Sequence, residues 1–140
     1  MTGFGARRIK LFVDASAFVA MLADEPERER LVDVLGRADE PLWSAMACWE
    51  AISGLRSSHR WTIDAARSEI ELLVGQLPFR LVAIGEDERV VALDAYRAFG
   101  KRSGHRAQLN MGDCFAYACA KTSDSRLLYK GDDFIHTDLA

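Results

Sequence analysis

The sequence predicts a single α/β domain over residues 1–140, a three-layer α/β/α sandwich with a mainly parallel central sheet. Short apolar runs of the kind that form buried strands alternate with helical patterns along the whole chain, as in βαβ units. No linker, internal repeat or low-complexity tract divides the 140 residues, a length that suits one domain. Apolar residues make up 49% of the chain, which is enough for a core that needs no disulfides.

The first half of the chain begins with its clearest strand. Residues 9–13 form a nearly continuous apolar run, as expected for a strand buried on both faces. Asp14 follows directly and can cap a helix that ends near Ala23. The elements expected next are a helix over 26–36, a short strand at 42–43, and a helix over 45–56 capped by Ser44.

The second half continues the alternation. Thr62 begins a helix whose apolar residues recur with a period of about 3.6, and it ends before Pro78. The elements expected after it are a strand over 80–84, a helix over 86–99, a loop over 100–109, a helix over 112–121 with Asn110 as its N-cap, and a strand over 126–129. A turn at 131–134 follows, and the last residues are expected to add an edge strand.

Charge and cysteine content limit the classes of function. The net charge is -3, so contact with nucleic acid would depend on local basic patches. No apolar run approaches the roughly 20 residues that cross a bilayer, and the start lacks a signal-peptide pattern. Three cysteines without a CxxC pair indicate reduced thiols. We therefore expect a cytoplasmic protein, with residues 1–8 as a disordered or extended N-terminus.

Two acidic residues are candidates for a site. Asp14 ends the first strand, where α/β proteins build their sites, and Asp113 lies in the first turn of a later helix. Each has a simpler explanation, because Asp is a favoured N-cap and an acid in the first turn is stabilised by the helix dipole. Gly112 favours a functional interpretation, since glycine destabilises a helix and is retained where something approaches the backbone closely.

Glu50 is the most informative acid. Its neighbours over 45–52 are almost all apolar or small, and a buried carboxylate is costly unless it is paired or binds a metal. The alternative is an exposed residue on a narrow polar stripe with Ser53 and Gly54.

Two adjacent acids, Asp132 and Asp133, follow the last clear strand. A simple turn would explain them, but neighbouring carboxylates repel each other, and a cation relieves that repulsion. Oxygen-only ligands suit Mg²⁺ or Mn²⁺. The three histidines are scattered, so a zinc site is not expected.

At these motifs the chain resembles PIN-domain proteins, in particular VapC-type toxins of bacterial toxin–antitoxin pairs. The resemblance rests on four segments, in order and over nearly the whole chain: Val13–Ala17, the lone Glu50 in an Ala-rich helix, Leu109–Cys114, and Leu127–Asp138.

The resemblance implies a PIN-like fold, Mg²⁺-dependent endoribonuclease activity with Mn²⁺ as a substitute, and inhibition by a cognate VapB-type antitoxin. By motif, the family's acidic quartet falls on Asp14, Glu50, Asp113 and Asp133, with Asp14 and Asp113 as metal ligands. The commonest form of the last motif has Asn at position 132. Asp132 therefore leaves the fourth acid open between two residues, and the motif favours Asp133.

Supporting roles follow from position. Ser16 and Asn110 could orient metal ligands or water, and Asp132 belongs to the same outer shell if Asp133 is the ligand; capping alone would also explain Ser16 and Asn110. The expected RNA contacts are in the basic loop and are Lys101, Arg102, His105 and Arg106, although a solvated loop is the alternative.

Further expectations concern aromatic residues and protein partners. The tryptophans at 43, 49 and 61 are better explained by packing than by base stacking. The amphipathic stretches 52–61 and 65–73 could receive an antitoxin helix or a second protomer, and we expect a homodimer.

Two rival interpretations are weaker. A phosphotransferase of the haloacid-dehalogenase class needs a second Asp two residues after the first, where this chain has Ser16. A receiver-like module needs an acidic pair after the first strand, and only Asp14 is present. A non-catalytic PIN-like or receiver-like binding module therefore remains as the alternative to an enzyme.

Overall fold

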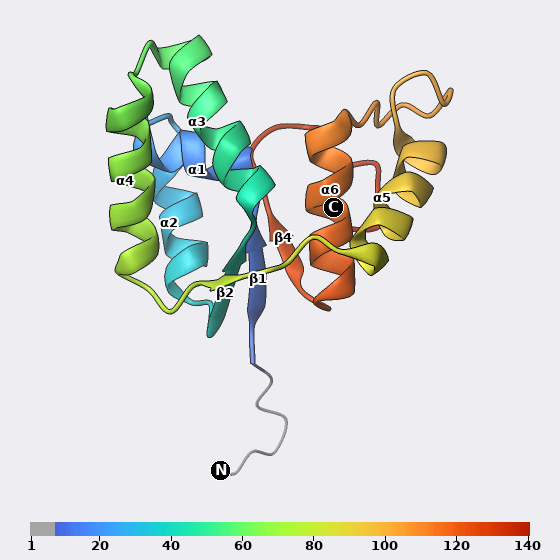
Figure 1. Cartoon of the computed structure of the whole chain (residues 1–140), viewed down its shortest axis with the longest axis horizontal. Coiled ribbons are helices and arrows are strands. Elements are labelled where there is room, and N and C mark those ends of the chain that lie inside the picture. The colour runs from blue at the N-terminus through green and yellow to red at the C-terminus, as the bar shows by residue number, and fades with distance from the viewer. Residues whose placement is uncertain (1–7) are drawn as a thin grey trace.

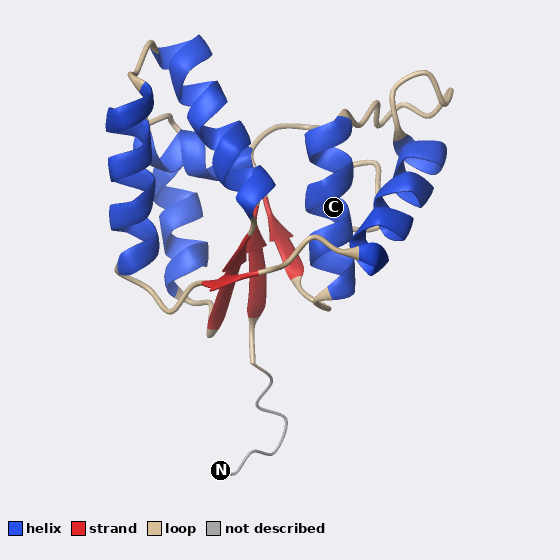
Figure 2. Ribbon diagram, in the orientation of Figure 1, coloured by secondary structure: helices blue, strands red, loops and turns tan. Residues whose placement is uncertain are grey.

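A four-stranded parallel sheet lies between two groups of helices in the computed structural model, which describes residues 8–140 (Figures 1 and 2). The strand order is β3-β2-β1-β4. The strands are β1 (Lys10–Val13), β2 (Glu40–Trp43), β3 (Arg80–Leu81) and β4 (Arg126–Leu128). The predicted α/β sandwich with a parallel sheet is confirmed. The expectation for the N-terminus falls mostly on residues 1–7, which lie outside the described residues.

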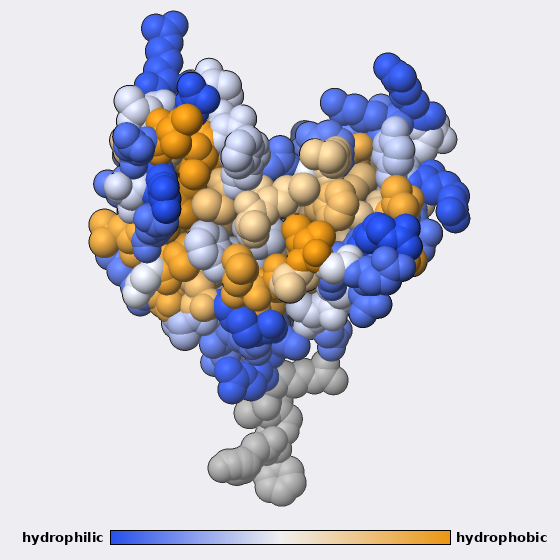
Figure 3. Space-filling view, in the orientation of Figure 1, coloured by the Kyte–Doolittle hydropathy of each residue, from blue (hydrophilic) through white to orange (hydrophobic). Residues whose placement is uncertain are grey.

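The helices divide between the two faces of the sheet (Figure 2). One face is covered by α1 (Ala15–Leu22), α2 (Arg28–Gly36), α3 (Ala45–His59) and α4 (Ile63–Gly75). The other is covered by α5 (Glu86–Phe99) and α6 (Met111–Thr122). The two groups diverge above the sheet and leave the molecule hollowed between them (Figure 3).

Strand β1 supplies side chains to both cores. Leu11 and Val13 pack with the α1–α4 group, whereas Phe12 between them packs with α5 and α6. This follows from the two-residue period of a strand. The predicted strand buried on both faces is confirmed over Lys10–Val13, and Ile9 lies outside it and is exposed. In β4, Leu127 and Leu128 divide between the same two cores.

Strand β2 begins at Glu40, two residues before the predicted 42–43, because the sheet tolerates a proline at position 41. Glu40 donates its N–H to the Ile9 carbonyl beside β1, so the nitrogen of Pro41 faces the opposite side. On that side β3 pairs only with Leu42 and Trp43, and no ladder bond is lost at Pro41.

The sheet is shorter at its margins than expected. β3 covers two exposed residues instead of the predicted 80–84. The predicted C-terminal edge strand is wrong, since residues 129–140 contain turns and no strand. Phe134 is buried, and Asp138 accepts hydrogen bonds from Tyr117 Oη (2.7 Å) and Lys121 Nζ (2.6 Å). Side-chain contacts with α6, and not hydrogen bonds to the sheet, therefore fix the C-terminal segment.

The topology places several predicted site residues at one edge of the sheet. Asp14 follows β1, and the segment containing Asp133 follows β4, its parallel neighbour. Sites in parallel sheets form at this carboxyl edge. Among residues 8–140, no helix is both long enough and apolar enough to cross a membrane.

Candidate active site

The four predicted acids line one cavity at the carboxyl edge of the sheet. The cavity has a volume of about 290 Å³ and collects carboxylates from four parts of the fold. They come from the end of β1 (Asp14), from α3 (Glu50), from α6 (Asp113) and from the segment after β4 (Asp133). Ser16 and Asn110 line the same cavity, and Asp132 does not.

Asp14 is buried, and the turn that starts α1 orients its carboxylate. Its Oδ2 accepts hydrogen bonds from the Ser16 backbone N–H (3.0 Å) and hydroxyl (2.6 Å). The Ser16 Oγ also accepts from the Lys130 N–H (3.0 Å) and so fixes the segment after β4 to the start of α1. Burial raises the pKa of Asp14, although the bonds from Ser16 oppose that rise. Capping and a position in the cavity are therefore compatible roles for one residue.

Asp113 is oriented by a reciprocal cap at the start of α6. Its N–H donates to Asn110 Oδ1 (2.9 Å), and its Oδ2 accepts from the Asn110 N–H (3.1 Å). Burial, followed by the charges of Asp133, Asp14 and Glu50, raises the pKa of Asp113 to about 7, although the bond from Asn110 opposes that rise. Within residues 8–140, no lysine, arginine or histidine forms an ion pair with any acid of the quartet.

Glu50 lies directly against the backbone of Gly112. A Cβ built on Gly112 would overlap Glu50 Oε1, so any larger residue at this contact between α3 and α6 would displace the Glu50 carboxylate. The prediction that something approaches Gly112 closely is confirmed. Glu50 is half-buried, and burial followed by the charge of Asp14 raises its pKa. It faces the cavity and not an exposed polar stripe.

Asp133 and Asp132 are both exposed but differ in placement. Gly131 adopts a positive φ of 97° and turns the chain directly before the pair. Asp133 reaches the cavity, where its charge raises the pKa of both Asp14 and Asp113. Asp132 is not among the residues that line the cavity. This placement favours Asp133 as the fourth acid.

The donor set fits a hard divalent cation. Asp14 and Asp113 are buried carboxylates without a basic partner in the described part of the chain, and the charge of Asp14 raises the pKa of both Glu50 and Asp113. Among residues 8–140, no three acidic, histidine or cysteine side chains are grouped tightly enough to ligate one ion together. Mg²⁺ is usually held by one or two carboxylates and completes its shell with water, so this arrangement suits it.

The comparison with known families decides the relationship. A family model described as PIN domain matches residues 11–139. The chain belongs to the PIN-domain family. Within it, the chain is a member of the VapC ribonucleases. It is 40% identical over 139 residues to a VapC ribonuclease of Rhizobium meliloti, covering 91% of this chain and 98% of the relative. It is 41% identical to ribonuclease VapC30 of Mycobacterium tuberculosis, covering 93% and 96%.

Solved structures support the PIN fold. The Mycobacterium tuberculosis toxin VapC20, which cleaves the sarcin-ricin loop, matches with a TM-score of 0.69 at 16% identity, covering 89% of this chain and 92% of that one. A toxin–antitoxin complex from Klebsiella pneumoniae matches with a TM-score of 0.59 at 12% identity, covering 84% and 82%. At these identities the likeness concerns the fold alone.

The basic loop of this PIN domain is fixed at its base. Lys101 N–H donates to the Leu109 carbonyl (3.0 Å), and Leu109 N–H donates to the Phe99 carbonyl (2.9 Å). Lys101, Arg102 and Arg106 are exposed. His105 is engaged inside the loop: its ring packs edge-on against Phe99 at 5.0 Å, and its Nδ1 accepts from the Ala107 N–H. The loop therefore offers three cations that form no ion pair within residues 8–140, and the predicted contact through His105 would need its ring to leave this packing.

Sequence reasoning missed a linked group of three residues, two of which line the cavity. Glu25 Oε1 pairs with Lys130 Nζ (3.0 Å), and Glu25 Oε2 with His59 Nε2 (2.7 Å). Burial opposes the change, but the hydrogen bonds from His59 and Lys130 hold the pKa of Glu25 below its ordinary value. Glu25 and Lys130 also line the cavity. No local pattern signals this group, because the three residues lie far apart in the chain.

The tryptophans divide by environment. Trp43 contacts Phe18 and Phe79 in an aromatic cluster, and Trp61 packs against the same core. This supports the expectation that they pack and do not stack on bases. Trp49 differs, with 77% of its surface exposed.

Proposed function

We propose that this PIN-domain protein is a divalent-metal-dependent endoribonuclease, the toxin of a toxin–antitoxin pair. The observation that carries the proposal is the acidic cavity, in which Asp14 and Asp113 are buried as carboxylates without a basic partner among the described residues. A divalent cation would offset that charge and would in turn attract the negatively charged phosphodiester of the substrate. The identity of 40% with VapC ribonucleases supports RNA as the substrate.

The chain's own residues divide the work of this reaction. Asp14 and Asp113 would hold Mg²⁺ or Mn²⁺, with Glu50 and Asp133 completing the site directly or through water. The cation lowers the pKa of water and stabilises charge on the phosphate. Glu50 is half-buried, faces the cavity and has a raised pKa, so it can accept the proton of the attacking water. Ser16 and Asn110 orient the two buried carboxylates.

The proposed partners are RNA, a cognate VapB-type antitoxin and a second copy of the chain, in the cytoplasm. Large apolar side chains are exposed on α3 and at both ends of α4: Trp49 (77%), Ile63 (50%) and Leu72 (59%). Apolar surface of this kind is typical of sites that bind a partner helix or a second protomer.

Cleavage of RNA by the purified protein tests the proposal. We expect cleavage with Mg²⁺ or Mn²⁺ that stops with EDTA and falls by about 100-fold or more in Asp14→Asn and Asp113→Asn, as for groups that support the reacting centre. Asp64→Asn, an exposed acid at the start of α4, is the matched control and keeps full activity. Asp133→Asn should reduce cleavage more than Asp132→Asn.

Two results would count against the proposal. Cleavage that survives both Asp14→Asn and Asp113→Asn would place the activity elsewhere. Absence of cleavage together with absence of metal binding by calorimetry would favour the non-catalytic binding module.

A further inference from the structure

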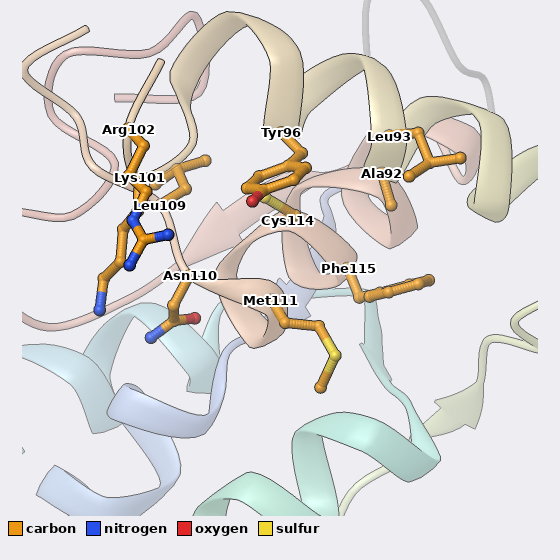
Figure 4. A pocket seen from close by; sticks show the side chains of 10 residues that line it. All are labelled: Ala92, Leu93, Tyr96, Lys101, Arg102, Leu109, Asn110, Met111, Cys114 and Phe115. Carbon is orange, nitrogen blue, oxygen red and sulfur yellow. The ribbon is translucent and has the colours of Figure 1, made fainter. Parts of the chain in front are cut away.

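A second, larger pocket lies between α5 and α6, next to the acidic cavity (Figure 4). Its volume is about 520 Å³, within the range of small-ligand sites. Its walls are mainly apolar and include Ala92 and Leu93 from α5 and Cys114 and Phe115 from α6. Lys101 and Arg102 of the basic loop also line it, whereas none of the sequence motifs discussed above includes the α5 residues of its wall.

The pocket adjoins the acidic cavity through Asn110. Asn110 lines both hollows and caps the helix that carries Asp113. If one phosphate of an RNA strand lies in the acidic cavity, a neighbouring nucleotide of that strand would therefore lie at this pocket.

Tyr96 presents an aromatic ring at this pocket. The residue is 53% exposed, and its ring lies against Gly100, where a Cβ would overlap both the ring and the Tyr96 carbonyl. The ring is thus placed before any ligand binds. Exposed aromatic faces of this kind stack on unpaired bases of RNA.

Two basic side chains stand at one end of the pocket. Lys101 and Arg102 line it on the same side as Asn110 (Figure 4). Neither forms an ion pair within residues 8–140, whereas Arg89 and Arg97 on the preceding helix are paired with neighbouring acids. In a protein of net charge -3, two basic side chains beside an aromatic pocket, neither paired with an acid in the described part of the chain, indicate an anionic ligand with an apolar part.

We propose that this pocket binds one unpaired base of the RNA substrate, stacked on Tyr96, with an adjacent phosphate against Lys101 and Arg102. The inference rests on the proposed nuclease function and adds a subsite to it. A nucleotide combines the two features that the pocket recognises, a flat apolar base and an anionic phosphate. The pocket would thereby select RNA that is unpaired next to the cleaved bond.

The test measures binding of a short single-stranded RNA that carries 2-aminopurine, whose fluorescence is quenched on stacking. Asp113→Asn serves as the background so that the RNA stays intact. In that background, Tyr96→Ala should weaken binding by about 5- to 150-fold and abolish the quench, because an aromatic platform for one base is lost. Tyr96→Phe should restore both. Lys101→Ala with Arg102→Ala should weaken binding and reduce its dependence on salt, whereas Arg97→Ala should change neither.

A second measurement uses unaltered pocket residues. Single-stranded RNA carrying 4-thiouridine should cross-link on irradiation to residues of this pocket, as mapped by mass spectrometry. Cross-links confined to other surfaces, or full binding and quench in a folded Tyr96→Ala, would overturn the proposal. A change in oligomeric state of Tyr96→Ala by sedimentation, with RNA binding unchanged, would also overturn it and assign the pocket to a second protomer.

Failure of the pocket and failure of the nuclease are separable. Wild-type protein that quenches the RNA without cleaving it would leave the subsite standing and refute the nuclease. Cleavage by Tyr96→Ala with an unchanged KM would refute the subsite and leave the nuclease standing.

Discussion

The contact between Glu50 and Gly112 shows how a single residue choice supports the site. Alanine is favoured over glycine inside a helix by about 1 kcal/mol, yet a Cβ at position 112 would overlap the Glu50 carboxylate. We predict that Gly112→Ala lowers the free energy of unfolding by about 1–3 kcal/mol, as overpacking does, and reduces RNA cleavage. Urea unfolding and initial rates of cleavage measure the two effects.

Two further variants isolate that contact. Gly36→Ala, at the end of α2, has open space around its new Cβ and should leave stability equal or slightly raised. Glu50→Ala combined with Gly112→Ala should recover the lost stability without recovering cleavage. Full stability and activity in Gly112→Ala alone would show that the carboxylate can move away freely.

Asp113 should make the metal-free protein less stable as the pH rises. Its pKa is about 7 in the folded state against an ordinary 3.8, so the folded state holds its proton more tightly. Stability from this residue is fully present below about pH 4, falls as the pH rises toward about 7 and is constant above, by a total on the order of a few kcal/mol. Asp113→Asn removes this dependence. Urea unfolding in EDTA across that pH range measures the free energy of unfolding of the wild type and of Asp113→Asn. The two plots of free energy against pH should converge at low pH, and parallel plots would contradict the prediction.

At the scale of elements, the sequence predicted what depends on local pattern. The apolar run of β1, the caps at Asp14, Ser44 and Asn110, and the position of Asp113 depend on near neighbours and are found as expected. That Pro41 lies inside strand β2 was not predicted, because a proline fits there only if β3 begins to pair after it. The edge strand failed for a similar reason: whether the C-terminal segment pairs or packs is decided by α6.

The Glu25 group is the clearest case of a feature that only the fold reveals. It joins the loop after α1, the end of α3 and the segment after β4. Because these bonds hold the pKa of Glu25 below its ordinary value, their contribution is present above about pH 4.5 and is lost as the pH falls through the folded pKa. We predict that Glu25→Gln costs about 1–2 kcal/mol near neutral pH by urea unfolding and little at low pH.

A surface ion pair provides the control for the stability cost of Glu25→Gln. Asp33 and Arg37 form an exposed pair within α2, and Asp33→Asn should cost less than about 0.5 kcal/mol. Equal effects of Glu25→Gln and Asp33→Asn would show that the Glu25 group does not tie the three segments together.

For the whole molecule, the acidic cavity concentrates repulsion where the two helix groups meet. Asp14 follows β1, Glu50 belongs to the α1–α4 group and Asp113 to the α5–α6 group, so a bound cation would tie together parts of the fold on both sides of the sheet. We therefore predict that Mg²⁺ stabilises the protein globally, by about 2.7 kcal/mol at a concentration 100 times its Kd. The gain in stability at a fixed Mg²⁺ concentration should be larger at about pH 8 than at about pH 6, because a cation must displace the proton that Asp113 retains near pH 7. Thermal unfolding with MgCl₂, compared with NaCl of equal ionic strength, measures this gain. Asp113→Asn should lose the response while Asp64→Asn keeps it, and an equal response in both variants would mean that Mg²⁺ acts outside the cavity.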